Sequence, residues 1–591
     1  MSIIDIEKLV IPSGKIGNSS SIDLVDIAGT IKTSSQFLTN FAIDYSGNLG
    51  IITSLDCALL ASIIGSAIAP GLWEIQVGVT ETIGSNGSTN ASNYVTPFSI
   101  FASANTTGYM SGVLSGTSTV TIQGGTQSIG GTAYSGGGLI VTHGNNTFTG
   151  VTTVQSGANL QVGLNETNTT TKLGTLTTQA DSNSTVFGAY TTNTFATQGL
   201  NNVGTVSFIG PGVCGQGMMI ASTVVNSGVI NIDKASWRNQ STWSGTGIVN
   251  VKNGGTFVLS SIPIGSTTRI NLNGDGWCNA SGVKIGALNC TATGITYSAR
   301  INVQSASTIK LNTNMNVDFS GILSGSAPLR ITTLGTPING TIHLLNTANT
   351  YFGTITVDGT TLNASYGTAL QYAKIVLANG GRLGTNANSG ATISSLASNS
   401  STSYWQSGDP VNNTIRENGI TTYAGRLLWT GGQYAANYFL NGPATNQLTM
   451  TGTGNTGNIY PRNGARLILQ GATFTAPGGQ VRVATGATVS AGTSITAACT
   501  YLSLDATSNL EVRAVGVSCG LLKVGSLGLG LTAGWKVDLP DAMAPGTYEI
   551  LHNSGASSTV LPTTGVNNTG RTVSYAWQNG TLPRKLILTL I

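Results

Sequence analysis

Short runs of alternating apolar and polar residues recur along most of this chain, and Gly, Asn and Thr separate them. Typical runs are residues 228–232 and 247–251, about 20 residues apart. Alternation at a period of two predicts a half-buried β-strand. Parallel stacking of such strands satisfies their backbone N–H and C=O groups and buries their inward side chains as ladders. The pattern therefore predicts a β-solenoid with about 20 to 25 residues in each rung.

One stretch, residues 321–364, has a clear second copy at residues 112–163. Both copies open with Gly-x-Leu-Ser-Gly and both contain an Asn-Thr-aromatic-x-Gly motif, which begins at Asn146 and at Asn349. A Thr-Val pair follows the last glycine of the motif at the same offset in each copy. We expect the asparagine to occupy a tight turn, because asparagine favours turn conformations.

These residues resemble the autotransporter-associated β-strand repeat, which combines G-x-[IL]-S-G, an apolar strand, N-T-[YF]-x-G and a closing G-x-L-x-V. The resemblance implies a right-handed parallel β-helix of the kind found in long extracellular surface proteins, and it implies no particular chemistry. We expect the motif aromatics, Phe148 and Tyr351, in the core or on its flank, with ligand contact as the alternative. Partial closing elements occur at residues 157–160, 255–259, 464–469 and 486–489.

The expected fold is all-β: a parallel β-helix with a separate β-rich module before it and a β cap after it. The first 100 residues do not follow the repeat, and the pattern loosens again where aromatic residues concentrate. The expected parts are an N-terminal attachment module (1–100), β-helix repeats (101–400), an aromatic-rich loop or insertion (401–441), a β-helix continuation (442–520) and a C-terminal cap (521–591).

Charge is sparse and unevenly distributed. Charged residues make up 8% of the chain and the net charge is +4. Residues 1–100 hold eight acidic residues against three lysines, a net charge of −5, so the remainder carries +9. This contrast supports a separate N-terminal module. The basic remainder has no Lys/Arg cluster with interleaved aromatics, so we expect no nucleic-acid partner.

The sequence predicts no secretion signal and no membrane span. The start of the chain, residues 1–8, has no basic segment followed by an uninterrupted apolar stretch. The one long apolar run, residues 57–69, is shorter than the roughly 20 residues that cross a bilayer. We expect this run to be a buried helix or a pair of strands.

Cysteine and histidine spacing predicts no metal site and no cofactor, because no CxxC or Cys/His ligand set occurs. Cys499 and Cys519 lie about one turn apart, and Cys278 and Cys290 flank a loop. Either pair is a candidate disulfide, and buried free thiols are the favoured alternative. The six cysteines are Cys57, Cys214, Cys278, Cys290, Cys499 and Cys519.

The segment 401–441 carries the candidate binding residues, because aromatic rings stack on sugar faces and nearby polar groups bind hydroxyls. The alternative is an aromatic cluster packed over the solenoid. Asp409 and Glu417 are candidates for a glycosidase acid and base, which need a defined separation. The candidate glycan-binding residues are Tyr404, Trp405, Tyr423, Trp429 and Tyr434.

Three classes of function fit this sequence. The favoured one is a non-enzymatic virion protein of a bacteriophage or related virus, a fibre, spike or capsid decoration on the virion surface. Residues 1–100 would then bind other virion proteins, and surface loops would contact a host polysaccharide. A homotrimer is one candidate assembly and a monomer the other. The alternatives are a bacterial adhesin or surface-layer protein and a polysaccharide-degrading tailspike.

Overall fold

The computed structural model describes residues 148–163, 173–187, 195–335 and 340–591, with short gaps in the last range. These gaps are 386–389, 409–410, 418, 430–434, 476–477, 494–495, 516–517, 526–528, 556–559, 579 and 581. Before residue 148 it describes only strands, so the predicted N-terminal module otherwise lies outside the described residues, as does the whole run 57–69. These strands are β1 (Leu24–Val25), β2 (Ile31–Lys32), β3 (Leu72–Ile75), β4 (Thr80–Ile83), β5 (Phe98–Phe101), β6 (Thr107–Met110), β7 (Val113–Gly116), β8 (Thr119–Gln123), β9 (Thr126–Ile129), β10 (Thr132–Ser135) and β11 (Gly138–Val141).

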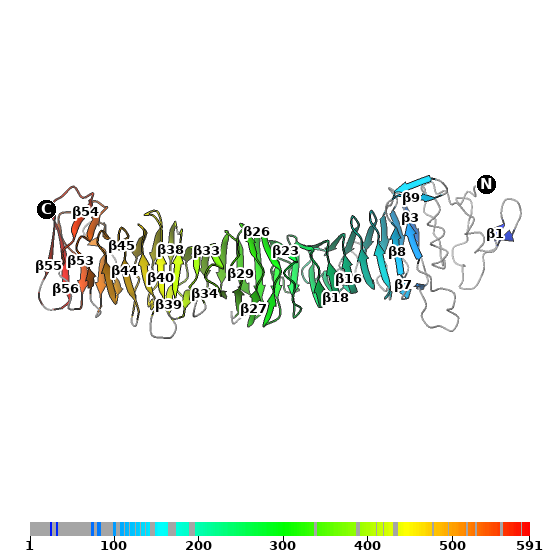
Figure 1. Cartoon of the computed structure of the whole chain (residues 1–591), viewed down its shortest axis with the longest axis horizontal. Coiled ribbons are helices and arrows are strands. Elements are labelled where there is room, and N and C mark those ends of the chain that lie inside the picture. Colours follow the sequence, from blue (N-terminus) through cyan, green and yellow to red (C-terminus); the bar gives the residue numbers. More distant parts are fainter. Residues whose placement is uncertain are drawn as a thin grey trace. The chain divides into compact units, whose positions relative to one another are not determined.

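The chain forms two compact units, and the elements described in both are β-strands (Figure 1). Unit 1 comprises Met1–Thr291 and Ser298–Asn302, and unit 2 comprises Ala292–Tyr297 and Val303–Ile591. Among the described residues, no helix is long and apolar enough to cross a membrane.

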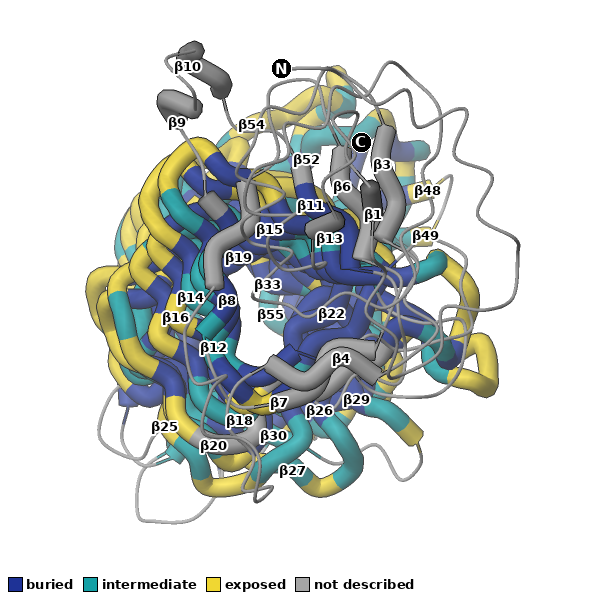
Figure 2. The backbone as a smooth tube through the Cα atoms, turned by 90° about the vertical axis from the view of Figure 1, so that its right-hand side faces the viewer, coloured by how far each residue is buried: buried dark blue, intermediate teal, exposed yellow. Residues whose placement is uncertain are grey.

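From β11 to β24, the strands of unit 1 form a solenoid of two parallel ladders. Thr175 pairs with Val151 on one side and with Gly199 on the other, so a turn takes 24 residues here. Inward residues alternate with outward ones along most of these strands (Figure 2). One ladder contains β13 (Asn159–Val162), β15 (Asn183–Phe187), β17 (Thr205–Ile209), β19 (Val229–Asp233), β21 (Ile248–Val251) and β23 (Arg269–Gly274). The other contains β12 (Val151–Val154), β14 (Thr175–Thr178), β16 (Phe195–Asn202), β18 (Met218–Asn226), β20 (Ser236–Ser244), β22 (Thr256–Leu259) and β24 (Leu288–Cys290).

The core of unit 1 holds stacked aromatic rings and hydrogen-bonded amides. Trp237 is fully buried between Phe208 and Phe257, with ring centroids 5.0 and 5.6 Å away. Asn202 donates a hydrogen bond of 2.8 Å to the side-chain oxygen of Asn226 on the next turn. These buried polar groups form hydrogen bonds with each other between turns. They therefore link adjacent rungs and avoid the free-energy cost of a buried polar group without a partner.

Unit 2 is also a solenoid of parallel ladders. One ladder contains β25 (Ile295–Tyr297), β27 (Met315–Phe319), β30 (Gly340–Leu344), β32 (Thr361–Ala364), β34 (Arg382–Thr385), β36 (Tyr404–Ser407) and β39 (Arg426–Trp429). The next contains β26 (Arg300–Leu311), β29 (Leu329–Thr333), β31 (Thr354–Asp358), β33 (Leu370–Ala378) and β35 (Thr392–Ser398), with the short strand β28 (Leu323–Gly325) beside it in sequence. After β35 this ladder continues as two, one starting from β37 (Asn412–Ile415) and one from β38 (Ile420–Tyr423).

These two ladders run through the second half of unit 2. From β37 the strands are β40 (Asn437–Leu440), β42 (Asn458–Pro461), β44 (Gln480–Val483), β47 (Tyr501–Leu504) and β51 (Leu529–Leu531). From β38 they are β41 (Gln447–Met450), β43 (Arg466–Leu469), β45 (Thr488–Thr493), β48 (Asn509–Val515), β52 (Lys536–Leu539) and β54 (Thr563–Asn567), and β49 (Ser518–Cys519) pairs with β48.

Strand pairing changes from parallel to antiparallel near the end of unit 2. β46 (Thr496–Cys499), β50 (Leu521–Val524) and β53 (Gly546–Asn553) stack in parallel. The final strand, β56 (Arg584–Leu590), then lies antiparallel between β53 and β55 (Val573–Gln578).

The asparagine of the repeat motif is a buried bridge between rungs. We expected Asn349 in a tight turn, but it follows the turn, and its side chain is buried. Its oxygen accepts a hydrogen bond of 2.8 Å from the backbone N–H of Leu323, and its amide donates one of 2.9 Å to the carbonyl of Ala369. The side chain therefore replaces missing ladder hydrogen bonds where the chain turns.

The motif aromatics lie in the core, as predicted, and do not form the alternative ligand contact. Tyr351 is 2% exposed and Phe148 is 3% exposed. The Tyr351 hydroxyl donates a hydrogen bond of 2.6 Å to the carbonyl of Ala327. Neither ring has the exposed face that a ligand would need.

The predicted β-solenoid is confirmed, and the pattern changes less than expected at residues 401–441. This segment, expected to be a loop or an insertion, contributes β36 to β40 to the ladders. Its aromatic residues fit the alternation, with Trp405, Tyr423 and Tyr438 inward and fully buried. Large inward rings hid the strand pattern in the sequence.

Candidate functional site

The outward surface of the β37–β40–β42–β44–β47 ladder gathers aromatic, amide and arginine side chains. The inward residues of these strands are buried, and every second residue points outward. Parallel pairing places Asn437 beside Asn412 and Tyr460 beside Phe439, so the outward residues form columns along the ladder. We call this surface the arginine–aromatic face. It consists of Asn412, Thr414, Arg416, Asn437, Phe439, Asn441, Asn458, Tyr460, Arg462, Gln480, Arg482, Ala484, Tyr501, Ser503 and Asp505.

Aromatic rings and guanidinium groups alternate in contact across this face. The rings of Phe439 and Tyr460 lie 5.0 Å apart between centroids. The guanidinium of Arg462 lies 4.1 Å from the Phe439 centroid, within the range of a cation–π interaction. That of Arg482 lies 5.6 Å from the ring of Tyr460 and 6.0 Å from that of Tyr501. All three rings are half-buried, so each keeps exposed surface.

A column of amides runs beside the rings. Asn437 donates a hydrogen bond of 3.0 Å to the oxygen of Asn412, and Asn458 donates one of 3.2 Å to the oxygen of Asn437. The backbone N–H of Gln480 continues the column with a 3.2 Å hydrogen bond to the Asn458 oxygen. This ladder fixes the orientation of the amides. Asn412 is exposed and Asn437 is half-buried, so these two amides can meet sugar hydroxyl groups, whereas Asn458 is buried and supports them.

The arginines are held by neutral partners. Arg482 donates from Nε and from a terminal nitrogen to the side-chain oxygen of Gln480, at 2.9 and 2.6 Å. The Nε of Arg462 donates to the oxygen of Asn441. Arg416 lies over the exposed ring of Tyr372, 6.0 Å from its centroid. Within the described residues, none of these three arginines forms an ion pair with a carboxylate.

Local burial shifts the pKa values of two residues on this face, Arg462 and Tyr460. Burial lowers the pKa of the Arg462 guanidinium from its usual high value. Burial also raises the pKa of the Tyr460 hydroxyl, although the charge of Arg482 and a hydrogen bond with Asn458 oppose the rise. Tyr460 is therefore a neutral hydroxyl at physiological pH and can both donate and accept a hydrogen bond.

The structure separates the five predicted glycan-binding residues. Trp405 and Tyr423 have no exposed surface, so they cannot stack on a sugar and we remove them from the set. Tyr404 and Trp429 are half-buried on the β34–β36–β39 ladder, where Arg382 lies 5.1 Å from the Tyr404 centroid. Tyr434 lies outside the described residues.

The structure does not describe the two carboxylates considered for catalysis, Asp409 and Glu417, as a pair. Glu417 is exposed beside the arginine–aromatic face, and Asp409 lies outside the described residues. Stacking instead brings together two carboxylates that sequence reasoning missed, Glu511 and Asp538, which pair in register on β48 and β52. No local sequence signal connects them, because they are 27 positions apart.

Glu511 belongs to an ion-pair network with Arg466 and Arg513, and Asp538 lies beside it. The buried carboxylate of Glu511 accepts hydrogen bonds from Arg466 and Arg513, the latter at 2.5 Å. Asp538 accepts one of 2.8 Å from the backbone N–H of Val566. Burial raises the pKa of Asp538 despite that hydrogen bond, and the negative charge of Glu511 adds to the rise. Arginine side chains bind the Glu511 carboxylate, and a backbone N–H binds the Asp538 carboxylate. The two carboxylates therefore have a structural role.

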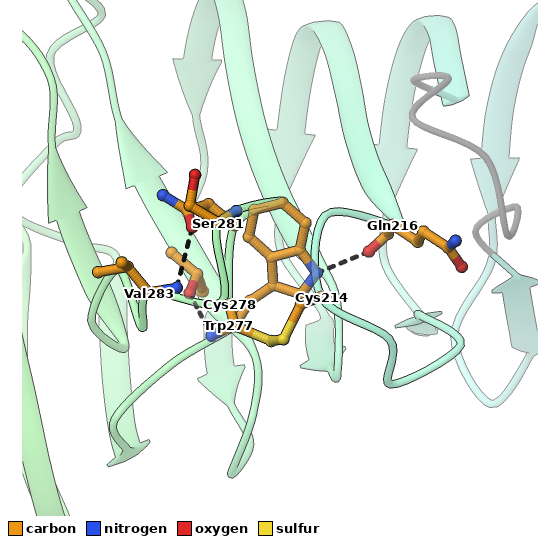
Figure 3. The surroundings of a disulfide bond; sticks show 8 residues. Cys214, Gln216, Trp277, Cys278, Ser281 and Val283 are labelled. Atoms are coloured by element: carbon orange, nitrogen blue, oxygen red, sulfur yellow. Dashed lines mark hydrogen bonds between the residues drawn. A yellow bond between two sulfur atoms is a disulfide. The ribbon is translucent and has the colours of Figure 1, made fainter.

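A disulfide joins two excursions from one corner of unit 1 (Figure 3). Cys214 follows β17 and Cys278 follows β23, and these strands belong to the same ladder with β19 and β21 between them. The Trp277 indole donates a 2.6 Å hydrogen bond to the carbonyl of Gln216, and the N–H of Gly215 donates one of 2.8 Å to the carbonyl of Cys278.

The structure contains neither candidate pairing, and it confirms the favoured alternative, buried free thiols, for Cys290 and Cys499. Cys278 bonds to Cys214 across a separation of 64 residues, so it cannot pair with Cys290. Cys290 and Cys499 are free and buried and Cys519 is free, so Cys499 and Cys519 do not pair. Burial raises the pKa of the Cys290 and Cys499 thiols to about 12. The long spacing concealed the true pair, because only stacking brings the two corners together.

Close packing of the two excursions requires glycine at one position. Gly215 has a φ of +80°, and a Cβ there would lie 2.7 Å from the Cα of Ala280. Such a contact is shorter than carbon atoms tolerate, so any other residue would push the excursions apart.

Sequence reasoning missed the arginine–aromatic face because its members are scattered over residues 412–505. The signal exists only when the sequence is arranged by rungs, where Phe439, Tyr460 and Arg482 fall at intervals of about 21 residues. Among the described residues, no group of His, Cys, Asp and Glu side chains is arranged to hold a metal ion. No protein-family model and no curated protein matches this chain.

Proposed function

We propose that this protein is a non-enzymatic attachment protein, which uses the arginine–aromatic face of unit 2 to contact a surface polysaccharide. The observation that carries the proposal is the combination of half-exposed rings of Phe439, Tyr460 and Tyr501 with an oriented amide column. Rings bind the apolar faces of sugars, and amides bind their hydroxyl groups. A rigid parallel ladder holds both in place, so little side-chain entropy is lost on binding.

The proposed setting is the surface of a bacteriophage or related virion, with the chain acting as a fibre, spike or capsid decoration. A β-solenoid suits a projecting structural element, because each rung rests on its neighbours and the array extends by repetition. The Cys214–Cys278 disulfide supports a protein that persists outside a reducing cytoplasm, as virion and cell surfaces do. In this proposal, residues 1–100 anchor the protein to the virion. The chain assembles as a homotrimer.

The second candidate is a bacterial surface adhesin, which the likeness of the Asn-Thr-aromatic repeat favours. Fractionation of the producing culture separates the two. Co-sedimentation of the protein with nucleic-acid-containing particles supports the virion role, and recovery with the cell envelope supports the adhesin. Light scattering on the full-length protein then determines whether it is a trimer or a monomer.

Glycan binding by the full-length protein tests the proposed face. We expect the double variant Phe439→Ala/Tyr460→Ala to lose binding on an array of bacterial surface polysaccharides, because it removes the stacked pair of rings. The matched control is Phe352→Ala/Tyr366→Ala, which removes two exposed aromatics outside the face. Equal binding by wild type and both variants, all with similar melting temperatures, would reject the face as the contact site.

A further inference from the structure

We infer that the ligand of the arginine–aromatic face is an acidic polysaccharide, one that carries carboxylate or sulfate groups at intervals along its chain. This inference rests on the proposed function, because it assigns the ligand class of the same face. The face bears the three arginines Arg416, Arg462 and Arg482, and the acidic member of its fifteen positions is Asp505.

The charge of these arginines is not neutralised by the described part of the protein. The ion pairs of unit 2 involve Arg330, Arg466, Arg513, His552 and Lys585 instead. Glu417 borders the face beside Arg416 but does not form an ion pair with it. A cluster of fixed positive charge without internal partners is complementary to a negatively charged ligand.

The guanidinium groups are oriented and still have donors to offer. A guanidinium has five N–H donors. Arg482 directs two nitrogens to Gln480, and Arg462 directs its Nε to Asn441. The remaining N–H groups suit the oxygens of a carboxylate or a sulfate, which guanidinium binds through charge-assisted hydrogen bonds. Because neutral amides hold the arginines in place, binding would not first require breaking an ion pair.

The repeat of the face along the ladder favours a polymer over a small anion. Arg462 directly follows β42 and Arg482 lies on β44, and paired strands are about 4.8 Å apart in a sheet. Arg416 lies two strands before Arg462, and the rings of Phe439 and Tyr460 lie on the strands between the outer arginines. A chain lying along the ladder would thus meet positive charge at both ends and aromatic surface in the middle.

A single-stranded nucleic acid is the other polyanion that combines charge and ring stacking. The exposed surface of Phe439, Tyr460 and Tyr501 would serve either ligand, so the polar groups beside the rings decide between them. The amide column favours a glycan, because amides match hydroxyl groups better than phosphates.

The test compares polymers that differ in charge. Full-length protein is titrated with dextran, dextran sulfate and polygalacturonate, with an oligothymidylate as the nucleic-acid probe. We expect dextran sulfate, polygalacturonate or both to bind at least about tenfold more tightly than dextran, and added salt to weaken that binding. The variant Arg416→Gln/Arg462→Gln/Arg482→Gln should lose the difference. The control Arg269→Gln/Arg300→Gln/Lys523→Gln, with the same change in charge on exposed positions, should keep it.

Three results would overturn the inference. They are equal binding of charged and neutral polymers, an equal loss in the control variant, and tighter binding of oligothymidylate than of either acidic polymer. If dextran or a neutral array glycan binds and Phe439→Ala/Tyr460→Ala abolishes that binding, the proposed function survives and the acidic ligand class fails. If the same double variant binds every polymer as wild type does, both fail.

Discussion

Tyr438 meets Trp405 edge to face inside unit 2, with ring centroids 5.1 Å apart and ring planes at 75°. The Tyr438 hydroxyl also lies within hydrogen-bond distance of the carbonyl oxygens of Trp405 and Leu428, at 3.1 and 2.7 Å, and can donate its one proton to either. Both rings are fully buried on neighbouring rungs. The pair therefore anchors the core beneath the surface on which we place glycan binding.

Trp405→Ala should destabilise unit 2 by about 3 to 5 kcal/mol, because it removes a large buried ring and leaves a cavity against Tyr438. Trp405→Phe should cost less and should leave glycan binding unchanged in the folded protein. Denaturant unfolding followed by circular dichroism measures the first effect, and array binding the second. A stable Trp405→Ala variant with lost binding would return Trp405 to the glycan site.

Asn349→Ala should cost about 2 to 4 kcal/mol, because it leaves the Leu323 N–H and the Ala369 carbonyl without partners in a buried place. The neighbouring exposed residue offers a control, and Thr350→Ala should change stability by less than about 0.5 kcal/mol. The comparison is made by chemical unfolding. Similar stabilities of the two variants would contradict the role of Asn349 as a bridge between rungs.

Asp538→Asn should stabilise the protein at pH 7. The raised pKa of Asp538 means that the fold disfavours its ionised form, so stability is lost as pH rises from the unfolded pKa, about 3.9, through the folded one. Asparagine keeps an oxygen for the Val566 N–H and carries no charge. Melting temperatures of both proteins from pH 3 to pH 8 should converge at the acidic end. If Asp538→Asn melts at a lower temperature than the wild type at pH 7, Asp538 acts as an ionised partner of Arg466 or Lys536.

Cys214→Ser/Cys278→Ser should lower the stability of unit 1 by up to about 4 kcal/mol, the loop-closure value for a 64-residue ring. Reductant should destabilise the wild type by the same amount and leave the double variant unaffected. Cys519→Ser is the control, since that thiol is free. A reductant effect that persists in the double variant would place the sensitive bond elsewhere.

The alternation of apolar and polar residues was enough to predict the solenoid. The two runs that first suggested rungs, residues 228–232 and 247–251, contain β19 and β21, and Val229 pairs with Ile248. Their spacing predicted the turn length, because in-register stacking repeats the same strand after each turn. The chemistry of the repeat motif was harder, since the hydrogen bonds of Asn349 go to other rungs.

The candidate site depended on strand phase, which the sequence left open at residues 404–407. A shift of one residue exchanges the buried and exposed sets of a strand. Tyr404 therefore faces outward and Trp405 inward, although both looked equally suited to bind sugar. The columns of the arginine–aromatic face and the Cys214–Cys278 bond share one cause, because both join residues that meet only after whole turns have stacked.

The Cys214–Cys278 bond makes residues 214–278 a closed covalent ring within unit 1. A protease that cuts the backbone once inside this ring produces no separate fragment, since the two pieces stay linked through sulfur. Such a nick would be visible on a reducing gel and hidden on a non-reducing one. In the attachment role that we propose, the bond would keep these turns together after a cut that would otherwise release them.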